Sequence, residues 1–412
     1  MKKIFTLIFS VLITPVIFAQ TRYKDQVFDF VRHADIEYGS NYDNKNQLTH
    51  LLMDVYEPKD DTAAKRPIIF FVHGGSFVGG DRNDQAINKT AEYFSKKGYV
   101  TANIEYRLEQ TEFIDPIVDF ADVYKWHRAI ARATQDLKAA IRYFKKDVAI
   151  NGNSYKVDTS TIFIYGSSAG AITCLHTAYM DDTSKMSFIF KNVYAGLGGL
   201  DGNSGNPGYS STNGIKAVVG CSGAIGDLNY LTNTKIPFLG FHNNPDFTVP
   251  YAQGCFITIA CWLGQFYGSS LIYPKVKSTG TYTEFYPINK AGHPADQVSD
   301  TASHRMILQK TTDFLYRIMN PSISTAVKNN IVQHIDLYPN PSNGNLNVTI
   351  PVALQQQALI LEIFSVDGAL LYTQNVKHQE VVPLQLAIPN GLYILSLKND
   401  TEHYLSKITI MQ

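Results

Sequence analysis

The sequence has no excess of charge of either sign. Its 412 residues include 36 Lys and Arg and 36 Asp and Glu, so the formal net charge is +0. A balanced charge gives no electrostatic footprint for nucleic acid or for an anionic membrane surface, and we expect neither as a partner. Hydrophobic residues make up 45% and charged residues 17%, which is typical of a folded chain and excludes a disordered acidic or basic one.

The sequence also lacks an apolar run long enough to cross a membrane. The run at 4–18 has 15 residues, whereas about 20 are needed to span hydrocarbon, so a transmembrane anchor is disfavoured. Lys2 and Lys3 precede this run and the small residue Ala19 follows it. A positive region, an apolar run and a small residue predict a signal peptide over 1–19, cleaved after Ala19, and therefore an exported protein.

Cysteine is scarce, with four residues, and no Cys-x-x-Cys or paired Cys/His spacing suggests a zinc site. We expect no metal and no organic cofactor. An exported chain meets oxidising conditions, and Cys255 and Cys261 could close a small loop in a segment rich in glycine and aromatic residues. We predict this disulfide, although four cysteines allow three pairings. Cys174 and Cys221 lie in apolar stretches and are expected to be free thiols.

Short apolar runs alternate with helical periodicity between about residues 51 and 320. This pattern predicts an α/β domain over 20–320, with a mostly parallel sheet flanked by helices. The runs Pro67–His73 and Thr161–Tyr165 are continuously apolar, as expected of central strands buried on both faces. Long helices are predicted over 118–146 and 301–319. The predicted strands are 51–56, 67–73, 99–105, 161–165, 216–221, 237–241 and 282–287.

The composition changes after Pro321, and the polar stretch 321–334 suits a linker. From residue 335 onward, β-rich runs at 346–350, 359–364 and 392–397 are separated by turn dipeptides. These dipeptides are Asn343-Gly344, Asp367-Gly368 and Asn390-Gly391. Turn signals between alternating runs predict a small antiparallel β-sandwich over 335–412.

Gly166-Ser-Ser-Ala-Gly170 follows a predicted strand and precedes a helix-compatible stretch. Gly-x-Ser-x-Gly in this context is typical of a nucleophile elbow. The turn is so tight that its central residue takes a strained backbone, and only glycines fit two residues before and after it. Ser168 is therefore the candidate nucleophile, because Ser167 lies off the tip of the elbow. A turn without chemical interest is the alternative, and the flanking strand and helix disfavour it.

Consecutive glycines in Phe70-Phe-Val-His-Gly-Gly-Ser-Phe-Val-Gly-Gly80 end another predicted strand. Backbone N–H groups there could stabilise the negative charge on a tetrahedral intermediate without reorganising. We assign the N–H groups of Gly74 and Gly75 to this oxyanion hole, with that of Ala169 as a third donor. The alternative is a glycine turn that only connects the strand to a loop.

The base and the acid of such a site follow the nucleophile in the chain order Ser, acid, His. His293, in Ala291-Gly-His-Pro294, comes after the last predicted strand of the domain, where a loop would overhang the elbow. Asp246 follows the strand 237–241 and could hold the imidazole through one ring nitrogen. Asp227 is the second choice for the acid, and its alternative role is a helix cap before 228–231. The histidines at positions 127, 176 and 304 lie inside predicted helices and are poor candidates for the base.

These stretches together resemble the α/β-hydrolase clan, specifically esterases of the hormone-sensitive-lipase-like and carboxylesterase type. The shared features, in the family's order, are His73-Gly-Gly75, Asp136, Val157-Asp158, the elbow around Ser168, Asp246-x-x-Val-Pro250 and Gly292-His293. Two positions depart from the family: Ser76 replaces the last glycine of the usual His-Gly-Gly-Gly, and Ser167 replaces a common acidic residue. The resemblance spans about 54–320 and implies an α/β-hydrolase fold and an ester substrate.

The tail resembles the C-terminal sorting domain of the type IX secretion system. The resemblance is carried by Leu337-Tyr-Pro-Asn-Pro-Ser-Asn-Gly344, Phe364-Ser-Val-Asp-Gly368, Asn390-Gly-Leu-Tyr-Ile394 and an apolar finish at 408–411. It implies recognition by the secretion machinery and a secreted or cell-surface protein. A carbohydrate-binding β-module is the alternative, which the Tyr-Pro-Asn-Pro opening disfavours.

The sequence therefore predicts a secreted serine esterase that acts through an acyl-enzyme, on short-acyl esters or on acetyl or feruloyl groups linked to polysaccharide. Two alternatives stay open. One is a peptidase of the same fold, which the glycine-rich oxyanion loop disfavours by resemblance. The other is a catalytically silent surface binding protein, although such proteins usually lose a residue of the elbow or the base.

Overall fold

The computed structural model describes residues 21–110, 123–256, 265–321, 333–366, 369–399 and 403–411. The chain divides into two compact units, Met1–Met319 and Asn320–Gln412. The predicted signal peptide 1–19, the residue Cys261, the dipeptide Asp367-Gly368 and most of the predicted linker lie outside the described residues.

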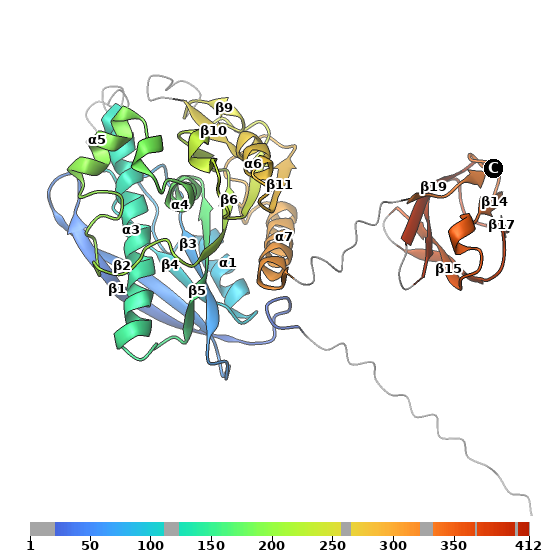
Figure 1. The fold of residues 1–412 in the computed structure, drawn as a ribbon, viewed down its shortest axis with the longest axis horizontal. Coiled ribbons are helices and arrows are strands. Elements are labelled where there is room, and N and C mark those ends of the chain that lie inside the picture. Colours follow the sequence, from blue (N-terminus) through green and yellow to red (C-terminus); the bar gives the residue numbers. More distant parts are fainter. Residues whose placement is uncertain are drawn as a thin grey trace, which may run out of the picture. The chain divides into compact units, whose positions relative to one another are not determined.

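The large unit is built on an eight-stranded sheet with the strand order β1-β2-β4-β3-β5-β6-β8-β11 (Figure 1). The pairs β1–β2 and β2–β4 are antiparallel, and the other five neighbouring pairs are parallel. The predicted mostly parallel sheet is thus confirmed. The strands are β1 Phe30–Tyr42, β2 Leu48–Pro58, β3 Arg66–Val72, β4 Val100–Ile104, β5 Val157–Ser167, β6 Ile215–Cys221, β8 Phe238–Asn243 and β11 Thr283–Ile288.

Helices cover both faces of this sheet because its central strands are apolar on both sides. In β3, the side chains of Ile68 and Phe70 belong to the core that includes α3, α4, α5 and α6. Ile69 and Phe71 belong to the opposite core, with α1 and α7. The helices are α1 Gln85–Ser95, α3 Val123–Ile150, α4 Ala169–Tyr179, α5 Phe188–Gly196, α6 Ser269–Ser278 and α7 Thr301–Met319, with 3₁₀ turns at Thr183–Lys185 and Leu228–Leu231.

The structure adds several elements that the sequence pattern did not predict. Strand β1 lies at the edge of the sheet, and most of its residues are exposed or half-buried, so it has no apolar run to signal it. Helices α1, α5 and α6 were also missed. A separate three-stranded sheet is formed by the short strands β7 Ala224–Ile225, β9 Gln253–Gly254 and β10 Phe266–Gly268. The first residues of the helix predicted at 118–146 lie outside the described residues, and α3 extends to Ile150.

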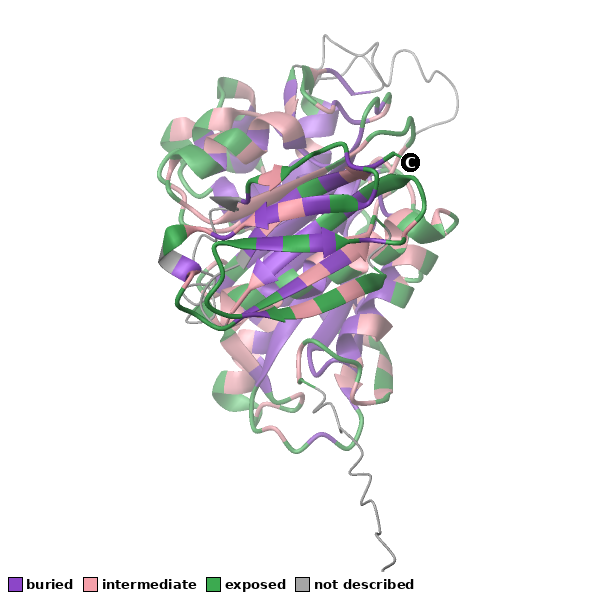
Figure 2. Ribbon diagram, turned by 90° about the vertical axis from the view of Figure 1, so that its right-hand side faces the viewer, coloured by how far each residue is buried: buried purple, intermediate pink, exposed green. Residues whose placement is uncertain are grey.

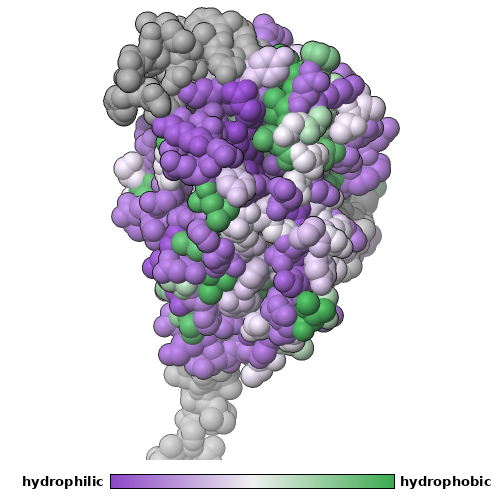
Figure 3. All heavy atoms as spheres, turned by 90° about the vertical axis from the view of Figure 1, so that its left-hand side faces the viewer, coloured by the Kyte–Doolittle hydropathy of each residue, from purple (hydrophilic) through white to green (hydrophobic). Residues whose placement is uncertain are grey.

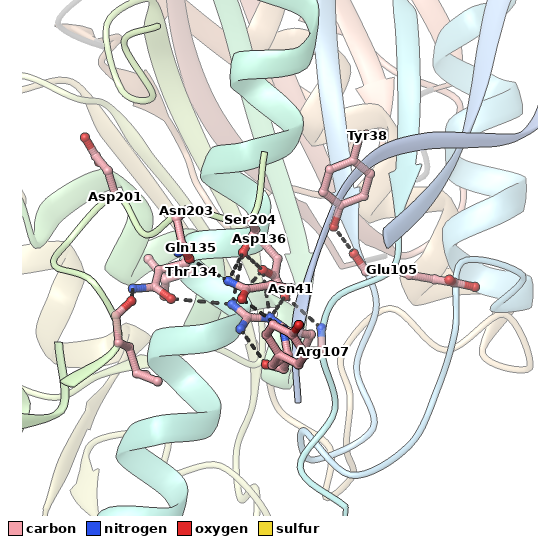
Figure 4. A network of polar contacts seen from close by, with 12 residues as sticks. Tyr38, Asn41, Glu105, Arg107, Thr134, Gln135, Asp136, Asp201, Asn203 and Ser204 are labelled. Carbon is pink, nitrogen blue, oxygen red and sulfur yellow. Dashed lines mark hydrogen bonds and ion pairs between the residues drawn. The ribbon is translucent and has the colours of Figure 1, made fainter. Parts of the chain in front are cut away.

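A buried ion pair joins the segment after β4 to helix α3 (Figure 4). The Arg107 guanidinium donates to the Asp136 carboxylate with Nη2–Oδ1 at 2.8 Å, and the Arg107 backbone N–H donates to Oδ2 at 2.9 Å. Ser204 Oγ donates to Asp136 Oδ1 at 2.6 Å, and Arg107 Nη1 donates to the Tyr42 carbonyl at 3.0 Å. The ion pair therefore ties together the end of β1, which accepts from Arg107, with the loop after β4, α3 and the segment that contains Ser204.

The small unit consists of two sheets with their own hydrophobic core. Its strands alternate between buried and exposed residues, as expected of sheets with one face in the core (Figure 2). All neighbouring pairs are antiparallel except β12–β19, so the predicted antiparallel β-sandwich is confirmed. The five-stranded sheet contains β12 Gln333–His334, β19 His403–Ile410, β18 Gly391–Lys398, β15 Leu359–Ser365 and β16 Leu370–Val376; the other contains β13 Leu337–Tyr338, β14 Asn345–Thr349 and β17 Val381–Gln385.

The face of the large unit seen in Figure 3 is mostly hydrophilic, with small apolar groups between polar residues. Apolar residues scattered in this way are ordinary on a protein surface. Among the described helices, none combines the length and hydropathy that a membrane span requires.

Replacing Asp136 by Ala should lower the free energy of unfolding of the large unit by about 3–5 kcal/mol, because the Arg107 guanidinium would stay buried without its partner. Urea denaturation of the full chain would measure this through tryptophan fluorescence, since Trp126 and Trp262 both belong to the large unit. The exposed Asp313→Ala is the control, with an expected change within about 0.5 kcal/mol. Equal stabilities for the two variants would contradict this prediction.

Candidate active site

Ser168 lies at a sharp turn between β5 and α4. Its backbone has φ 53° and ψ −119°, a strained conformation that residues other than glycine rarely adopt. The turn is fixed on both sides. The Ser168 N–H donates to the Cys221 carbonyl on β6 at 2.8 Å, and the Ser168 carbonyl accepts from the Ile172 N–H at 3.0 Å.

The two glycines of the motif allow neighbouring backbones to approach this turn closely. A Cβ atom on Gly166 would collide with the Gly170 carbonyl group, and a Cβ atom on Gly170 would collide with the carbonyl oxygen of Val72 at the end of β3. Any larger residue would therefore push α4 away from the sheet. The Ser168 side chain is held where β3, β5 and α4 meet.

The structure brings the side chains of Ser168, His293 and Asp246 into one hydrogen-bonded chain. Ser168 Oγ lies 2.7 Å from His293 Nε2, and His293 Nδ1 lies 2.8 Å from Asp246 Oδ2. Serine comes from the turn after β5, aspartate from the loop after β8 and histidine from the loop after β11. A carboxylate on Nδ1 leaves Nε2 free to accept the serine proton.

The Asp246 carboxylate is fully buried and held by several donors. The N–H groups of Thr248 and Val249 donate to Oδ1 at 2.8 and 3.0 Å, and His242 Nε2 lies 3.4 Å from Oδ2. Burial alone would raise the pKa of Asp246, but the hydrogen bonds with His242, His293 and the Thr248 N–H hold this pKa well below its ordinary value. Asp246 is therefore an anion at neutral pH.

The other candidates for these positions have structural contacts elsewhere. Asp227 accepts from the Asn229 N–H at 2.8 Å and caps the 3₁₀ turn Leu228–Leu231, which was its alternative role. His176 is buried in α4, donates to the Ile172 carbonyl through Nδ1 and accepts the Gly226 N–H on Nε2. Burial lowers the pKa of His176 to about 4, so its ring is neutral.

The glycine loop after β3 lies against the elbow. A Cβ atom on Gly74 would lie 3.2 Å from Ser168 Cβ, and Gly75 has φ +106°, which favours glycine. His73 supports this loop, because its Nδ1–H donates to the Gly74 carbonyl at 2.7 Å and its ring stacks on Tyr106 with 4.4 Å between centroids. Burial lowers the pKa of His73, so it is neutral at pH 7.

The backbone N–H groups of Gly74, Gly75 and Ala169 make no hydrogen bond to any described residue. Ala169 is the first residue of α4, where N–H groups lack partners within the helix and the helix dipole favours negative charge. The three groups predicted to form an oxyanion hole are thus available to a ligand atom.

A cavity of about 490 Å³ opens beside these groups. Its walls come from the glycine loop, the start of α1, the elbow and the loop that carries His293. Polar groups contribute much of the lining. The lining residues are His73, Gly74, Gly75, Ser76, Gly80, Asp84, Gln85, Ala86, Ser167, Ser168, His293, Pro294, Asp296, Gln297, Val298 and Ser299.

Two buried residues of the site were not predicted from the sequence. His242 lies against Asp246, and Asp296 accepts a hydrogen bond from the Ser167 hydroxyl at 2.7 Å. The only signal for either was its position, since His242 precedes Asp246 by four residues and Asp296 follows His293 by three. Neither spacing defines a known chemical motif.

Two of the cysteines lie in the core of the large unit. Cys174 and Cys221 are free and buried, as predicted. Cys255 is buried, but Cys261 lies outside the described residues, so the disulfide between them stays a prediction. Within the described ranges, no group of three or more His, Cys, Asp or Glu side chains is arranged to hold a metal ion.

Comparison with curated proteins finds partial similarity to animal esterases. Carboxylesterase 3B of Mus musculus is 29% identical over 123 residues, which cover 30% of this chain and 19% of that protein. Gut esterase 1 of Caenorhabditis elegans is 28% identical over 133 residues, which cover 32% of this chain and 21% of that protein. The chain thus spans about a fifth of the length of these relatives.

Among solved structures, the apo form of Thermogutta terrifontis esterase 2 aligns with 20% identity and a TM-score of 0.48, covering 69% of this chain and 94% of that one. Its butyrate-bound form aligns with 19% identity and a TM-score of 0.47, covering 66% and 90%.

Two family models match separate parts of the chain. The BD-FAE family matches residues 53–229, which include the glycine loop and the elbow, and the secretion system C-terminal sorting domain matches residues 336–411. Residues 53–229 of the chain therefore match the BD-FAE family, and residues 336–411 match a C-terminal sorting domain, which indicates secretion to the cell surface or the extracellular space.

Proposed function

We propose that this protein is a secreted serine carboxylic-ester hydrolase in which Ser168 is the nucleophile, His293 the general base and Asp246 the orienting acid. One observation carries the proposal: the continuous chain from Ser168 Oγ through His293 to Asp246, with distances of 2.7 and 2.8 Å, at the wall of a cavity. Nucleophile and base within hydrogen-bonding reach, with the base oriented by a third group, is the arrangement that activates serine.

In the first step, Ser168 Oγ attacks the ester carbonyl carbon while His293 Nε2 takes the hydroxyl proton. Asp246 stabilises the imidazolium that forms, without itself becoming protonated. The carbonyl oxygen becomes an oxyanion, and the N–H groups of Gly74, Gly75 and Ala169 are the proposed donors to it. Such donors are already in place before the reaction, so they stabilise the developing negative charge without reorganising and thereby lower the barrier.

The tetrahedral intermediate then collapses to an acyl-enzyme. His293 returns its proton to the alkoxide leaving group, and the alcohol departs. Water attacks the acyl-enzyme by the same route, with His293 again taking the proton, so that the carboxylic acid is released and Ser168 is restored. No step requires a redox change.

The names of the matched relatives support ester hydrolysis as the reaction. The BD-FAE match covers the glycine loop and Ser168 but ends at residue 229, before Asp246 and His293. The roles of these two residues therefore rest on geometry rather than on the family match.

For the substrate, we propose short-acyl esters or acetyl and feruloyl esters linked to polysaccharide. Export places the enzyme where polymers are met, and a cavity whose wall includes Asp84, Gln85 and Gln297 suits a polar alcohol better than an alkyl chain. The sorting domain is proposed to engage the type IX secretion machinery.

Replacing Ser168 by Ala should lower kcat/KM on p-nitrophenyl acetate by about 10⁴-fold or more, because the acyl-enzyme cannot form. A fluorophosphonate probe should label the wild-type protein and leave the variant unlabelled. The melting temperature should change little, since only one hydroxyl is lost. Labelling of both proteins, or of neither, would contradict the assignment of Ser168.

Replacing Asp246 by Asn should lower kcat by about 10³–10⁴-fold, because the amide cannot stabilise the imidazolium and favours the wrong tautomer of His293. Asp227→Asn is the matched control, since Asp227 caps a 3₁₀ turn after the preceding parallel strand and should leave kcat unchanged within about twofold. Steady-state kinetics of both variants decides between the two acids. A larger loss of kcat in Asp227→Asn than in Asp246→Asn would assign the orienting acid to Asp227.

Activity on p-nitrophenyl esters from acetate to decanoate should be highest for the short acyl chains, because the described cavity is small and partly polar. Release of acetate and ferulate from acetylated and feruloylated xylan, measured by chromatography, tests the polymer substrates in parallel. A preference for decanoate without release from either xylan would show that the substrate assignment is wrong.

A further inference from the structure

A second carboxyl group lies buried beneath the elbow, and the proposed reaction does not use it. Asp296 is 1% exposed. Its Oδ1 accepts from Ser167 Oγ at 2.7 Å, and its Oδ2 accepts from Tyr165 Oη at 3.1 Å. It forms no ion pair with any described residue, and burial raises its pKa. Burying a carboxyl group without a cationic partner costs free energy of folding. The presence of Asp296 in this position therefore suggests a role beyond stability.

The contacts of Asp296 join two distant segments of the chain. Tyr165 and Ser167 belong to β5 and lie three residues and one residue before Ser168, whereas Asp296 belongs to the loop that carries His293. The bonds from Asp296 to Tyr165 and Ser167 span 131 and 129 residues of sequence. They therefore connect the strand that carries the nucleophile to the loop that carries the base.

That loop needs such contacts because it has no regular structure of its own. Residues 289–300, between β11 and α7, form neither helix nor strand. At its start, the Lys290 carbonyl accepts from Asn243 Nδ2 at 2.9 Å and the Gly292 N–H donates to the Pro245 carbonyl at 3.3 Å. These contacts hold the loop to the segment of Asp246, not to the segment of Ser168.

After His293, the loop is held by the neighbourhood of Asp296. The Ala295 N–H donates to Ser222 Oγ at 3.1 Å, and the Asp296 carbonyl accepts from His304 Nδ1 at 3.2 Å. The Asp296 carboxyl group then completes the attachment by reaching β5. The position of the His293 ring relative to Ser168 thus depends on bonds made on both sides of it.

We propose that Asp296 is a positioning residue for the ester-hydrolysing reaction: its carboxyl group clamps the His293 loop to the Ser167 and Tyr165 hydroxyls and so sets the distance between His293 Nε2 and Ser168 Oγ. This inference rests on the proposed function of Ser168 and His293. Asp296 acts through these residues and does not react with the substrate. A displacement of about 1 Å at a reacting group can cost about 10²-fold in rate, so a clamp of this kind has a measurable effect.

The clamp requires a polar group of this shape rather than a negative charge. Hydroxyl groups can donate or accept, so the carboxamide of asparagine can bond to both Ser167 and Tyr165, with its oxygen accepting from one and its amide donating to the other. Alanine removes both hydrogen bonds, leaves the Tyr165 hydroxyl only its contact with Cys221 Sγ at 3.0 Å, and releases the loop. The two substitutions therefore separate positioning from charge.

The experiment compares full-length wild type with Asp296→Ala, Asp296→Asn and Ser167→Ala on p-nitrophenyl acetate. Asp296→Ala should lower kcat by about 10²-fold with KM unchanged within about twofold, and Asp296→Asn should recover kcat to within about tenfold of wild type. Ser167→Ala, which removes one arm of the clamp, should lower kcat by about tenfold. The double variant Ser167→Ala with Asp296→Ala should be no slower than Asp296→Ala alone, because both changes break the same contact.

Asp147→Ala is the matched control, because Asp147 is also a buried carboxylate that accepts from a serine, with Ser154 Oγ at 2.9 Å, but it lies on α3. It should lower the melting temperature and leave kcat unchanged. If Asp296→Ala does not fold, Asp296→Asn and Ser167→Ala decide the question.

Three results would overturn the proposal: a wild-type kcat in Asp296→Ala or Ser167→Ala, a rise in KM in place of the fall in kcat, or an Asp296→Asn as slow as Asp296→Ala. Ser168→Ala is assayed in the same series. Wild-type turnover by Ser168→Ala would contradict the proposed function itself. This result is therefore distinguishable from a failure of the Asp296 proposal alone.

Discussion

The close approach of three backbone segments at the turn after β5 is the constraint on which the site depends. Glycine at positions 166 and 170 lets α4 pack against the end of β3, where the Val72 carbonyl leaves no room for a side chain. The parallel pairing of Val72 with Gly166 brings the loop that begins at Gly74 beside Ser168. A strained serine, an adjacent row of backbone N–H groups and a helix N-terminus therefore arise from one packing arrangement.

Two buried carboxyl groups near this turn have opposite environments. Asp246 is surrounded by donors, including two imidazoles, and its pKa is held low. Asp296 accepts from the hydroxyls of Tyr165 and Ser167 and lies beside the Cys221 thiol, with no cationic partner among the described side chains, and burial raises its pKa. Environments that separate two pKa values in this way commonly assign different roles to two acids. These environments fit the two proposed roles, Asp246 as the anion that orients His293 and Asp296 as the polar group that clamps the His293 loop.

The described parts of the proposed site all belong to the large unit, within residues 73–299. The small unit has its own core and matches a sorting domain, so the proposed site and the sorting segment belong to separately packed parts of one chain. A fold whose core is complete without the tail can keep its site geometry independent of the tail.

The sequence by itself determined the central strands, the helix 301–319, the β-rich tail and the elbow, because each is written in a local pattern: a continuous apolar run, a helical period, turn dipeptides or spaced glycines. It did not determine the edge strand β1, whose polar residues face solvent, or the clamp at Asp296. Only the tertiary structure decided that Asp246 faces His293 while Asp227 caps a turn. Both acids follow parallel strands of the sheet. Which carboxylate reaches the His293 ring, about 50 residues further along the chain, depends on how the loops fold over the sheet. This is a long-range property that local spacing does not encode.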